Sequence, residues 1–97
     1  MEAVIKMTKE IINLIDICKK FLQNQIIATE YINLFEDAFY NTPDDKFSEE
    51  ELDILSGIFD ANDMFEPHAL LRAESALYID EIELRRRVQI NIAKLTA

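Results

Sequence analysis

The sequence is poor in residues that break helices or carry out catalysis. Its 97 residues include one Gly, two Pro, one Cys, one His and no Trp. So few Gly and Pro residues argue against a fold of many tight turns and favour long helices. The single cysteine, Cys18, cannot form an internal disulfide, and its place among Ile15, Ile17 and Phe21 predicts a buried core thiol. We therefore expect a cytoplasmic protein.

Long apolar runs and basic segments are also missing. No stretch approaches the ~18 apolar residues that a bilayer requires. The N-terminus lacks the basic region, apolar stretch and small-residue cleavage site of a signal peptide. The net charge of −9 would repel the phosphates of nucleic acids and anionic membranes, so we expect no direct contact with either.

The negative charge is concentrated in the middle of the chain. Residues 30–66 contain twelve acids and one base, Lys46, a balance of −11, while the rest of the chain contributes +2 to the total of −9. Like charges this close repel one another and cost stability. The pattern predicts a protein that presents a negative surface to a positively charged partner.

Apolar residues recur at helical spacing and predict four long helices. The first is expected over residues 2–23, where Asn24 and its neighbour end it without a Gly stop signal. Thr29 is expected to cap a second helix, its hydroxyl binding a free backbone N–H. That helix reaches about Asn41, before the turn at Pro43.

The third helix has the clearest start signal in the chain. Ser48 and Glu51, three residues apart, predict a capping box, and Phe47 is expected to pack as a staple on Leu52. The helix should continue to about Phe65. Its core side is expected to consist of Leu52, Leu55, Ile58, Phe59 and Asn62.

The last helix should begin at a second capping box, formed by Asp80 and Glu83, and end near Leu95. Between Pro67 and this box, only a short helical turn at residues 68–71 is suggested. Two acid-first pairs four residues apart should support the last helix: Glu81 with Arg85 and Glu83 with Arg87. The pattern predicts an all-α, antiparallel four-helix bundle forming one domain over residues 1–97.

No constellation of catalytic or metal-binding residues is present. His68 lacks an acid at the spacing of a helical metal motif, and Cys18 has no His partner in the sequence. Residues 60–63 begin like a calcium loop, but Met64 stands at the fifth position and Leu71 where the final Glu belongs. We expect no enzymatic activity, no cofactor and no dedicated metal site.

Acyl carriers are another class of small acidic helical protein. They attach phosphopantetheine to a Ser at a helix start, within an Asp-Ser-Leu motif. Here Ser48 precedes Glu49 and is expected to be a cap, while Ser56 lies mid-helix. The motif is missing, so composition alone supports this alternative.

One face of the third helix is acidic. At ~100° per residue its polar positions fall within a sector of about 80°. These positions, which we call the acidic ridge, are Glu49, Asp53, Ser56, Asp60 and Asp63. Exposed helix faces usually mix charges of both signs, so an unmixed face predicts a partner surface. Its expected extension on the preceding helix consists of Glu36, Asp37 and Tyr40.

Three stretches carry a family resemblance. They are residues 20–31 (KFLQNQIIATEY) followed by Leu34, Phe35 and Phe39; Glu51 and Leu52 with residues 55–61; and residues 78–84 with Val88. Together they resemble the colicin-D-type immunity proteins, which include immunity proteins of contact-dependent inhibition systems. The resemblance extends over about residues 18–95. The family usually has a Gly in the link where this chain has Asn24 and Gln25.

The resemblance implies a cytoplasmic four-helix antidote. Such proteins bind the toxic nuclease domain of a colicin or contact-dependent inhibition toxin, often a tRNase, and cover its basic active cleft, here in an expected one-to-one complex. We take the contact residues from the acidic ridge and not from the family. They are Glu36, Asp37, Tyr40, Glu49, Asp53, Asp60 and Asp63. The alternative is an acidic helical adaptor or nucleic-acid mimic that binds a basic host regulator.

Overall fold

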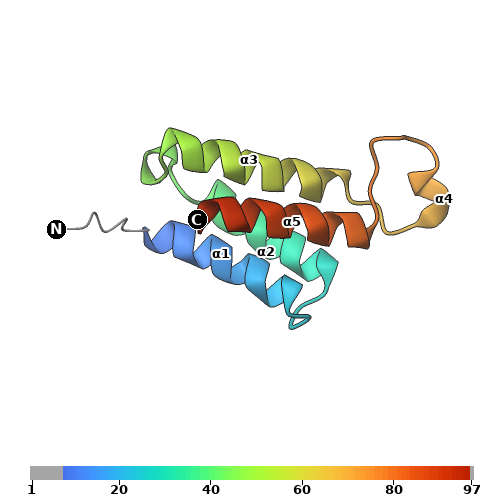
Figure 1. The fold of residues 1–97 in the computed structure, drawn as a ribbon, viewed down its shortest axis with the longest axis horizontal. Coiled ribbons are helices and arrows are strands. Elements are labelled where there is room, and N and C mark those ends of the chain that lie inside the picture. The colour runs from blue at the N-terminus through green and yellow to red at the C-terminus, as the bar shows by residue number, and fades with distance from the viewer. Residues whose placement is uncertain (1–7, 97) are drawn as a thin grey trace.

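The computed structural model describes residues 8–96 and confirms the all-α prediction. Its elements are α1 (Lys9–Leu22), α2 (Ala28–Tyr40), the 3-10 turn η1 (Asp44–Lys46), α3 (Glu49–Met64), the short α4 (Ala69–Arg72) and α5 (Glu81–Leu95). The four long helices run back and forth along the longest axis (Figure 1). Residues 2–7 of the first predicted helix lie outside the described residues.

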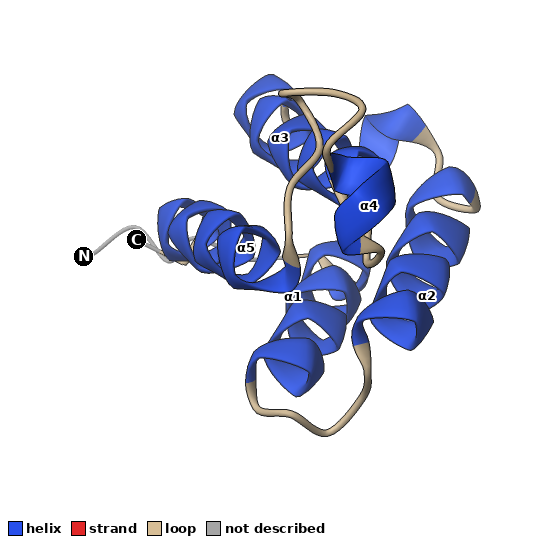
Figure 2. Ribbon diagram, turned by 90° about the vertical axis from the view of Figure 1, so that its right-hand side faces the viewer, coloured by secondary structure: helices blue, strands red, loops and turns tan. Residues whose placement is uncertain are grey.

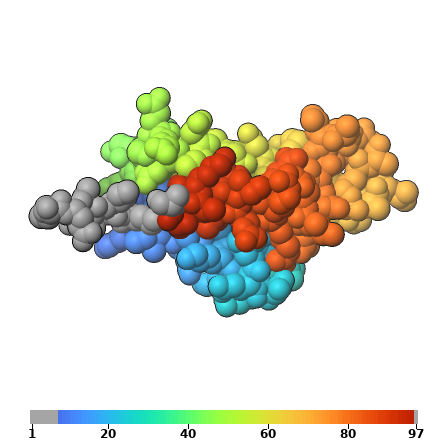
Figure 3. Space-filling view, viewed as in Figure 1, coloured from blue at the N-terminus to red at the C-terminus, as the bar shows by residue number. Residues whose placement is uncertain are grey.

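Within the described residues, no strand forms and one isolated parallel bridge joins Phe65 to Ile79. The bridge brings together the two ends of the segment that contains α4 (residues 65–79, the α4 segment). There, Ile79 N–H donates to the Met64 carbonyl at 2.9 Å. The segment lies over one end of the bundle (Figure 2) and projects beyond it (Figure 3). Two apolar residues of the α4 segment are strongly exposed, Leu70 at 88% and Leu77 at 70%. Ile82, at the start of α5, is 80% exposed.

The capping box of α3 is confirmed. Ser48 N–H donates to Glu51 Oε1 at 2.7 Å, and Glu51 N–H donates to Ser48 Oγ at 3.1 Å. Phe47 is buried, and its ring stacks on Phe39 of α2 with centroids 6.0 Å apart. The staple of Phe47 on Leu52 stays a prediction, and the contact on Phe39 anchors the start of α3 to α2.

The predicted N-cap at Thr29 is wrong. α2 begins at Ala28, and Ile27 occupies the capping position without a side-chain hydrogen bond. The Ile27 carbonyl accepts the first helical bond, from Tyr31 N–H at 2.9 Å. Ala28, the first residue of the helix, is 6% exposed and belongs to the core. Thr29 lies within the first turn.

The start of α5 matches the prediction in part. Asp80 Oδ1 accepts from Glu83 N–H at 2.9 Å, as a cap should. The reciprocal half of the predicted capping box is wrong, because the Glu83 carboxylate binds Arg86 at 2.6 Å and Arg87 at 2.8 Å. Both predicted ion pairs are confirmed, Glu81 with Arg85 at 2.9 Å and Glu83 with Arg87 at 2.8 Å.

Asn24 ends α1 in the conformation that usually favours Gly. Its φ is 62°, in the left-handed region. Gln25 N–H donates to the Lys20 carbonyl at 2.8 Å, and Asn24 N–H donates to the Phe21 carbonyl at 3.1 Å. These two bonds form a Schellman motif, so Asn24 replaces the Gly expected in this link.

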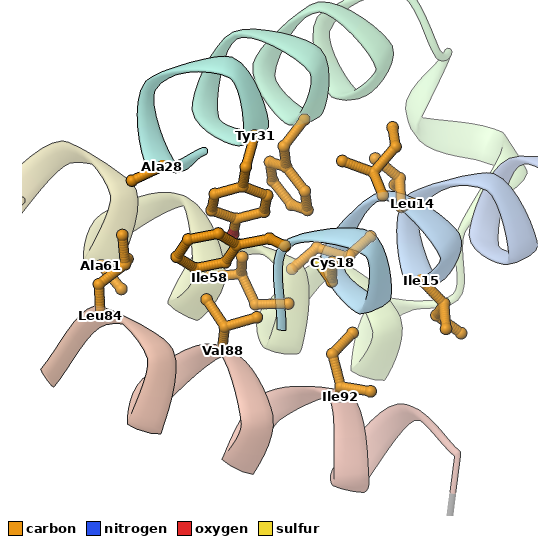
Figure 4. Packing of buried hydrophobic residues seen from close by; sticks show 14 of the residues in the cluster. Leu14, Ile15, Cys18, Ala28, Tyr31, Ile58, Ala61, Leu84, Val88 and Ile92 are labelled. Carbon is orange, nitrogen blue, oxygen red and sulfur yellow. The ribbon is translucent and has the colours of Figure 1, made fainter. Parts of the chain in front are cut away.

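The core is a continuous apolar layer between the long helices. α1 packs closely against α2 and α5, and α3 packs against α5. Side chains such as Leu14, Tyr31, Ile58 and Val88 point from the helices into this shared interior (Figure 4). Asn62, which the sequence placed on the core side of α3, is buried there at 3% exposure.

α2 and α3 meet mainly through aromatic side chains. Phe39 and Tyr40 both contact the ring of Phe59, with centroid distances of 6.1 and 5.6 Å. Bulky rings hold two helices apart where smaller residues would let the backbones approach. A groove lies along another part of this boundary, lined by residues between Thr29 and Glu36 and between Asn62 and Pro67, and the candidate site borders it.

Candidate functional site

The acidic ridge is a solvent-exposed face of α3. Glu49, Asp53, Ser56, Asp60 and Asp63 are all exposed, whereas the opposite side of the helix is buried in the core. α3, coloured green to yellow, forms the left and middle part of the upper edge of the molecule in Figure 3. The structure therefore places all five ridge positions where a partner can reach them.

The ridge carboxylates are not neutralised internally. The ion pairs found within residues 8–96 lie in α1, in α5 and in the turn after α3, and none involves a ridge residue. The first-turn acids of α3 also suit the positive end of its helix dipole, which explains part of the charge at Glu49. Asp53, Asp60 and Asp63 lie beyond that turn and have no such structural explanation.

A groove between α2 and α3 joins part of the predicted extension to the ridge. Its volume is about 380 Å³, and Glu36 and Asp63 both line it. The other lining residues are Thr29, Ile32, Asn33, Asn62, Phe65 and Pro67. The structure thus brings the carboxylate of α2 and the last carboxylate of the ridge to the same groove.

Asp37 does not line that groove. It lines a different groove of about 390 Å³ between α1 and α2, together with Asp16 and Lys20. Neighbouring helical residues point about 100° apart, so Glu36 and Asp37 face different helices. Of the two predicted acids on α2, only Glu36 shares a groove with a ridge residue.

Tyr40 is an exposed aromatic at the boundary of α2 and α3. Its side chain is 70% exposed, and its ring meets the Phe59 ring edge-on at 5.6 Å. Phe59 directly precedes the ridge residue Asp60. Tyr40 therefore presents an exposed aromatic ring near the ridge, and one side of that ring packs on Phe59.

The sequence interpretation did not assign Asn62 to the site. Its Oδ1 accepts from the Tyr31 hydroxyl at 2.8 Å, and its Nδ2 has no hydrogen-bond partner in the described structure. A buried amide with a free donor is costly, so this residue calls for an explanation. The available signal was an Asn at a core position of an otherwise apolar helix face.

Cys18 and His68, the two residues considered as catalytic candidates, have contacts that are typical of structural residues. Burial raises the pKa of the Cys18 thiol to about 12, which leaves the residue protonated and unreactive at neutral pH. His68 caps the short α4, and its ring contacts the Glu66 carboxylate at 3.1 Å. The bond from His68 N–H to that carboxylate contributes most to lowering the pKa of Glu66.

Within the described part of the chain, no helix is both long and apolar enough to cross a membrane. No group of three or more His, Cys, Asp or Glu side chains in residues 8–96 is placed to hold a metal ion.

The fold and its surface define a small all-α protein with an unneutralised acidic face. The profile of the bacterial self-protective colicin-like immunity family matches residues 7–95, and the chain belongs to this family. It is thus an immunity protein, a member of a family whose proteins bind and neutralise a cognate toxin. Comparison with curated proteins and with solved structures gave no match.

Proposed function

We propose that this immunity protein neutralises a nuclease toxin by covering the toxin's basic active cleft with the acidic ridge. The toxin would be an RNase, such as a tRNase of a colicin-D-type or contact-dependent growth inhibition system. Inhibition would occur in the cytoplasm, in a one-to-one complex. The observation that carries the proposal is the row of exposed ridge carboxylates without an internal base.

The geometry of the ridge suits this role. At a rise of about 1.5 Å per residue, Glu49 and Asp63 begin about 21 Å apart along the helix axis. Carboxylates spread over that length can bind lysines and arginines that otherwise hold RNA phosphates. Their long-range attraction would accelerate the encounter and make its rate fall with ionic strength.

Affinity also requires contacts other than charge pairs. Aromatic side chains are frequent among the residues that dominate binding energies. Tyr40 is 70% exposed and lies against Phe59 beside the ridge. We assign it the role of an apolar contact at the edge of the interface, next to Glu36.

The test is titration of the protein with the C-terminal domain of the toxin encoded beside it, with RNase activity as a parallel readout. Reversing three ridge charges in D53K/D60K/D63K should weaken binding by about 100-fold or more at physiological salt, because attraction becomes repulsion. The dependence of the association rate on salt should also become shallower.

The matched control reverses three exposed acids outside the ridge, in D44K/D45K/E74K. This variant has the same net charge, so it separates a local contact from the overall field. It should bind within about fivefold of the wild type. Equal losses in the two variants would refute the ridge as the contact surface. Wild-type protein that binds the domain without reducing RNase activity would refute inhibition by covering the cleft.

A further inference from the structure

The α2–α3 groove differs electrostatically from the groove between α1 and α2. Both have volumes near 400 Å³ (about 380 and 390 Å³). The α1–α2 groove contains its own cation, because Lys20 lies 3.4 Å from Asp16. The α2–α3 groove is lined by two carboxylates, of Glu36 and Asp63, and by no Lys or Arg. The two carboxylates therefore have no basic side chain of this chain in the groove, and a cation of a binding partner can pair with them.

Asn62 provides a second, independent indication of a ligand. The residue is 3% exposed and lines the groove, and its Nδ2 has no partner in the described structure. The Tyr31 hydroxyl holds Oδ1 on the core side. Asn62 is itself a lining residue of the groove, and its buried Nδ2 is the branch of the amide that Tyr31 leaves without a partner. It requires an acceptor, and a backbone carbonyl of a bound chain can supply one.

We propose that the α2–α3 groove is a socket for one arginine of the toxin. The guanidinium binds between the carboxylates of Glu36 and Asp63, and a carbonyl oxygen of the same segment accepts from Asn62 Nδ2. The identity of the partner rests on the proposed function, whereas the chemistry of the socket follows from the groove itself.

Arginine fits this groove better than lysine. Its planar guanidinium presents five N–H donors in a rigid fork, so it can bind two carboxylates at once. It also stacks on aromatic rings, and the half-buried Phe65 lines the groove. A lysine ammonium is a compact point charge, so it would pair with the two carboxylates but would not stack on the Phe65 ring.

The first test needs no toxin. The probe is acetyl-Gly-Arg-Gly-amide at millimolar concentration, added to ¹⁵N-labelled protein, with the uncharged citrulline peptide as the matched control. The side-chain amide signals of Asn33 and Asn62 should shift with the arginine peptide alone. Those of Asn13 and Asn41, which line the α1–α2 groove, should not. Equal shifts with both peptides, equal shifts in both grooves, or no shift would overturn the socket.

The second test uses the toxin domain and separates the socket from the ridge. The variant E36Q/D63N removes both groove carboxylates. The control D37N/D53N also removes one predicted acid of α2 and one of the ridge, but neither residue lines the groove. The socket requires the groove variant to lose at least about tenfold more affinity than its control. Equal losses would overturn the socket and leave the ridge standing.

Failure of the proposed function gives a different result. If wild-type protein does not bind the toxin domain, the proposed function is wrong, while the peptide experiment still reports on the groove. Denaturant unfolding of both double variants confirms that each is folded before its affinity is compared.

Discussion

The Tyr31 hydroxyl donates to Asn62 Oδ1 at 2.8 Å and joins α2 to α3 across the core. Tyr31 is fully buried, and burial is the main cause that raises its pKa above the ordinary value, so the hydroxyl remains a donor at every physiological pH. The Tyr31 ring also stacks on Phe21 at 4.4 Å. One side chain thus links α1, α2 and α3, and it bonds to Asn62, which lines the α2–α3 groove.

Removal of this hydroxyl tests the link directly. Y31F should lower the free energy of unfolding by about 1–3 kcal/mol, because Asn62 would keep a buried Oδ1 without its donor. Denaturant unfolding measures the change. Y78F removes a hydroxyl from a side chain that is 41% exposed and should change stability by less than about 0.5 kcal/mol. A Y31F protein as stable as Y78F would show that the bond contributes nothing.

Asn24 permits a test of the turn after α1. N24A should lower the free energy of unfolding by about 1 kcal/mol, because an Ala side chain is strained at a φ of 62°. N24G should equal or exceed the wild type, since Gly adopts this conformation without strain. The neighbouring residue Gln23 has a φ of −91°, so Q23A should be nearly neutral. If N24A and N24G had the same thermal midpoint, the left-handed turn would be refuted.

The start of α5 should respond to acid. Hydrogen bonds from Arg86 and then Arg87 are the main causes that lower the pKa of Glu83 from 4.5 to about 2. A carboxyl group with a lowered pKa in the folded state stabilises the fold above its unfolded value, here 4.5, and that contribution is lost as pH falls toward 2. The E83Q variant lacks this group, so its stability should fall less steeply between these values than that of the wild type.

Thermal unfolding at a series of pH values across this window measures the difference between wild type and E83Q. Because these side chains are solvent-exposed in part, 1 M salt should reduce the difference. Parallel curves for the two proteins at low salt would contradict the stabilising role of the Arg86 and Arg87 contacts.

Local features of the fold were predictable from the sequence because they depend on residues three or four positions apart. The capping box of Ser48 and Glu51, the pair of Glu81 and Arg85, and the buried position of Asn62 are all present. Each follows from the helical repeat, which brings such residues together whatever the rest of the chain does.

Where the capping predictions failed, the residues involved are also close in the sequence, so helical spacing alone does not decide which of several local contacts forms. Thr29 has a good capping side chain, yet the helix starts one residue before it, at Ala28, which packs in the core. The Glu83 carboxylate could have completed a capping box, yet arginines on the next turn bind it. Tertiary packing and competing charges outweigh a capping preference of about 1 kcal/mol.

The sequence by itself determined the all-α class, the acidic ridge and the family of this protein, because helical periodicity and local charge are properties of the chain. Only the tertiary structure decided which helices border each acidic side chain. A helical repeat states which face a residue occupies but not which neighbour that face meets. Packing therefore placed Glu36 opposite Asp63 and turned Asp37 toward α1. It also left Asn62 Nδ2 without a partner at the groove between α2 and α3.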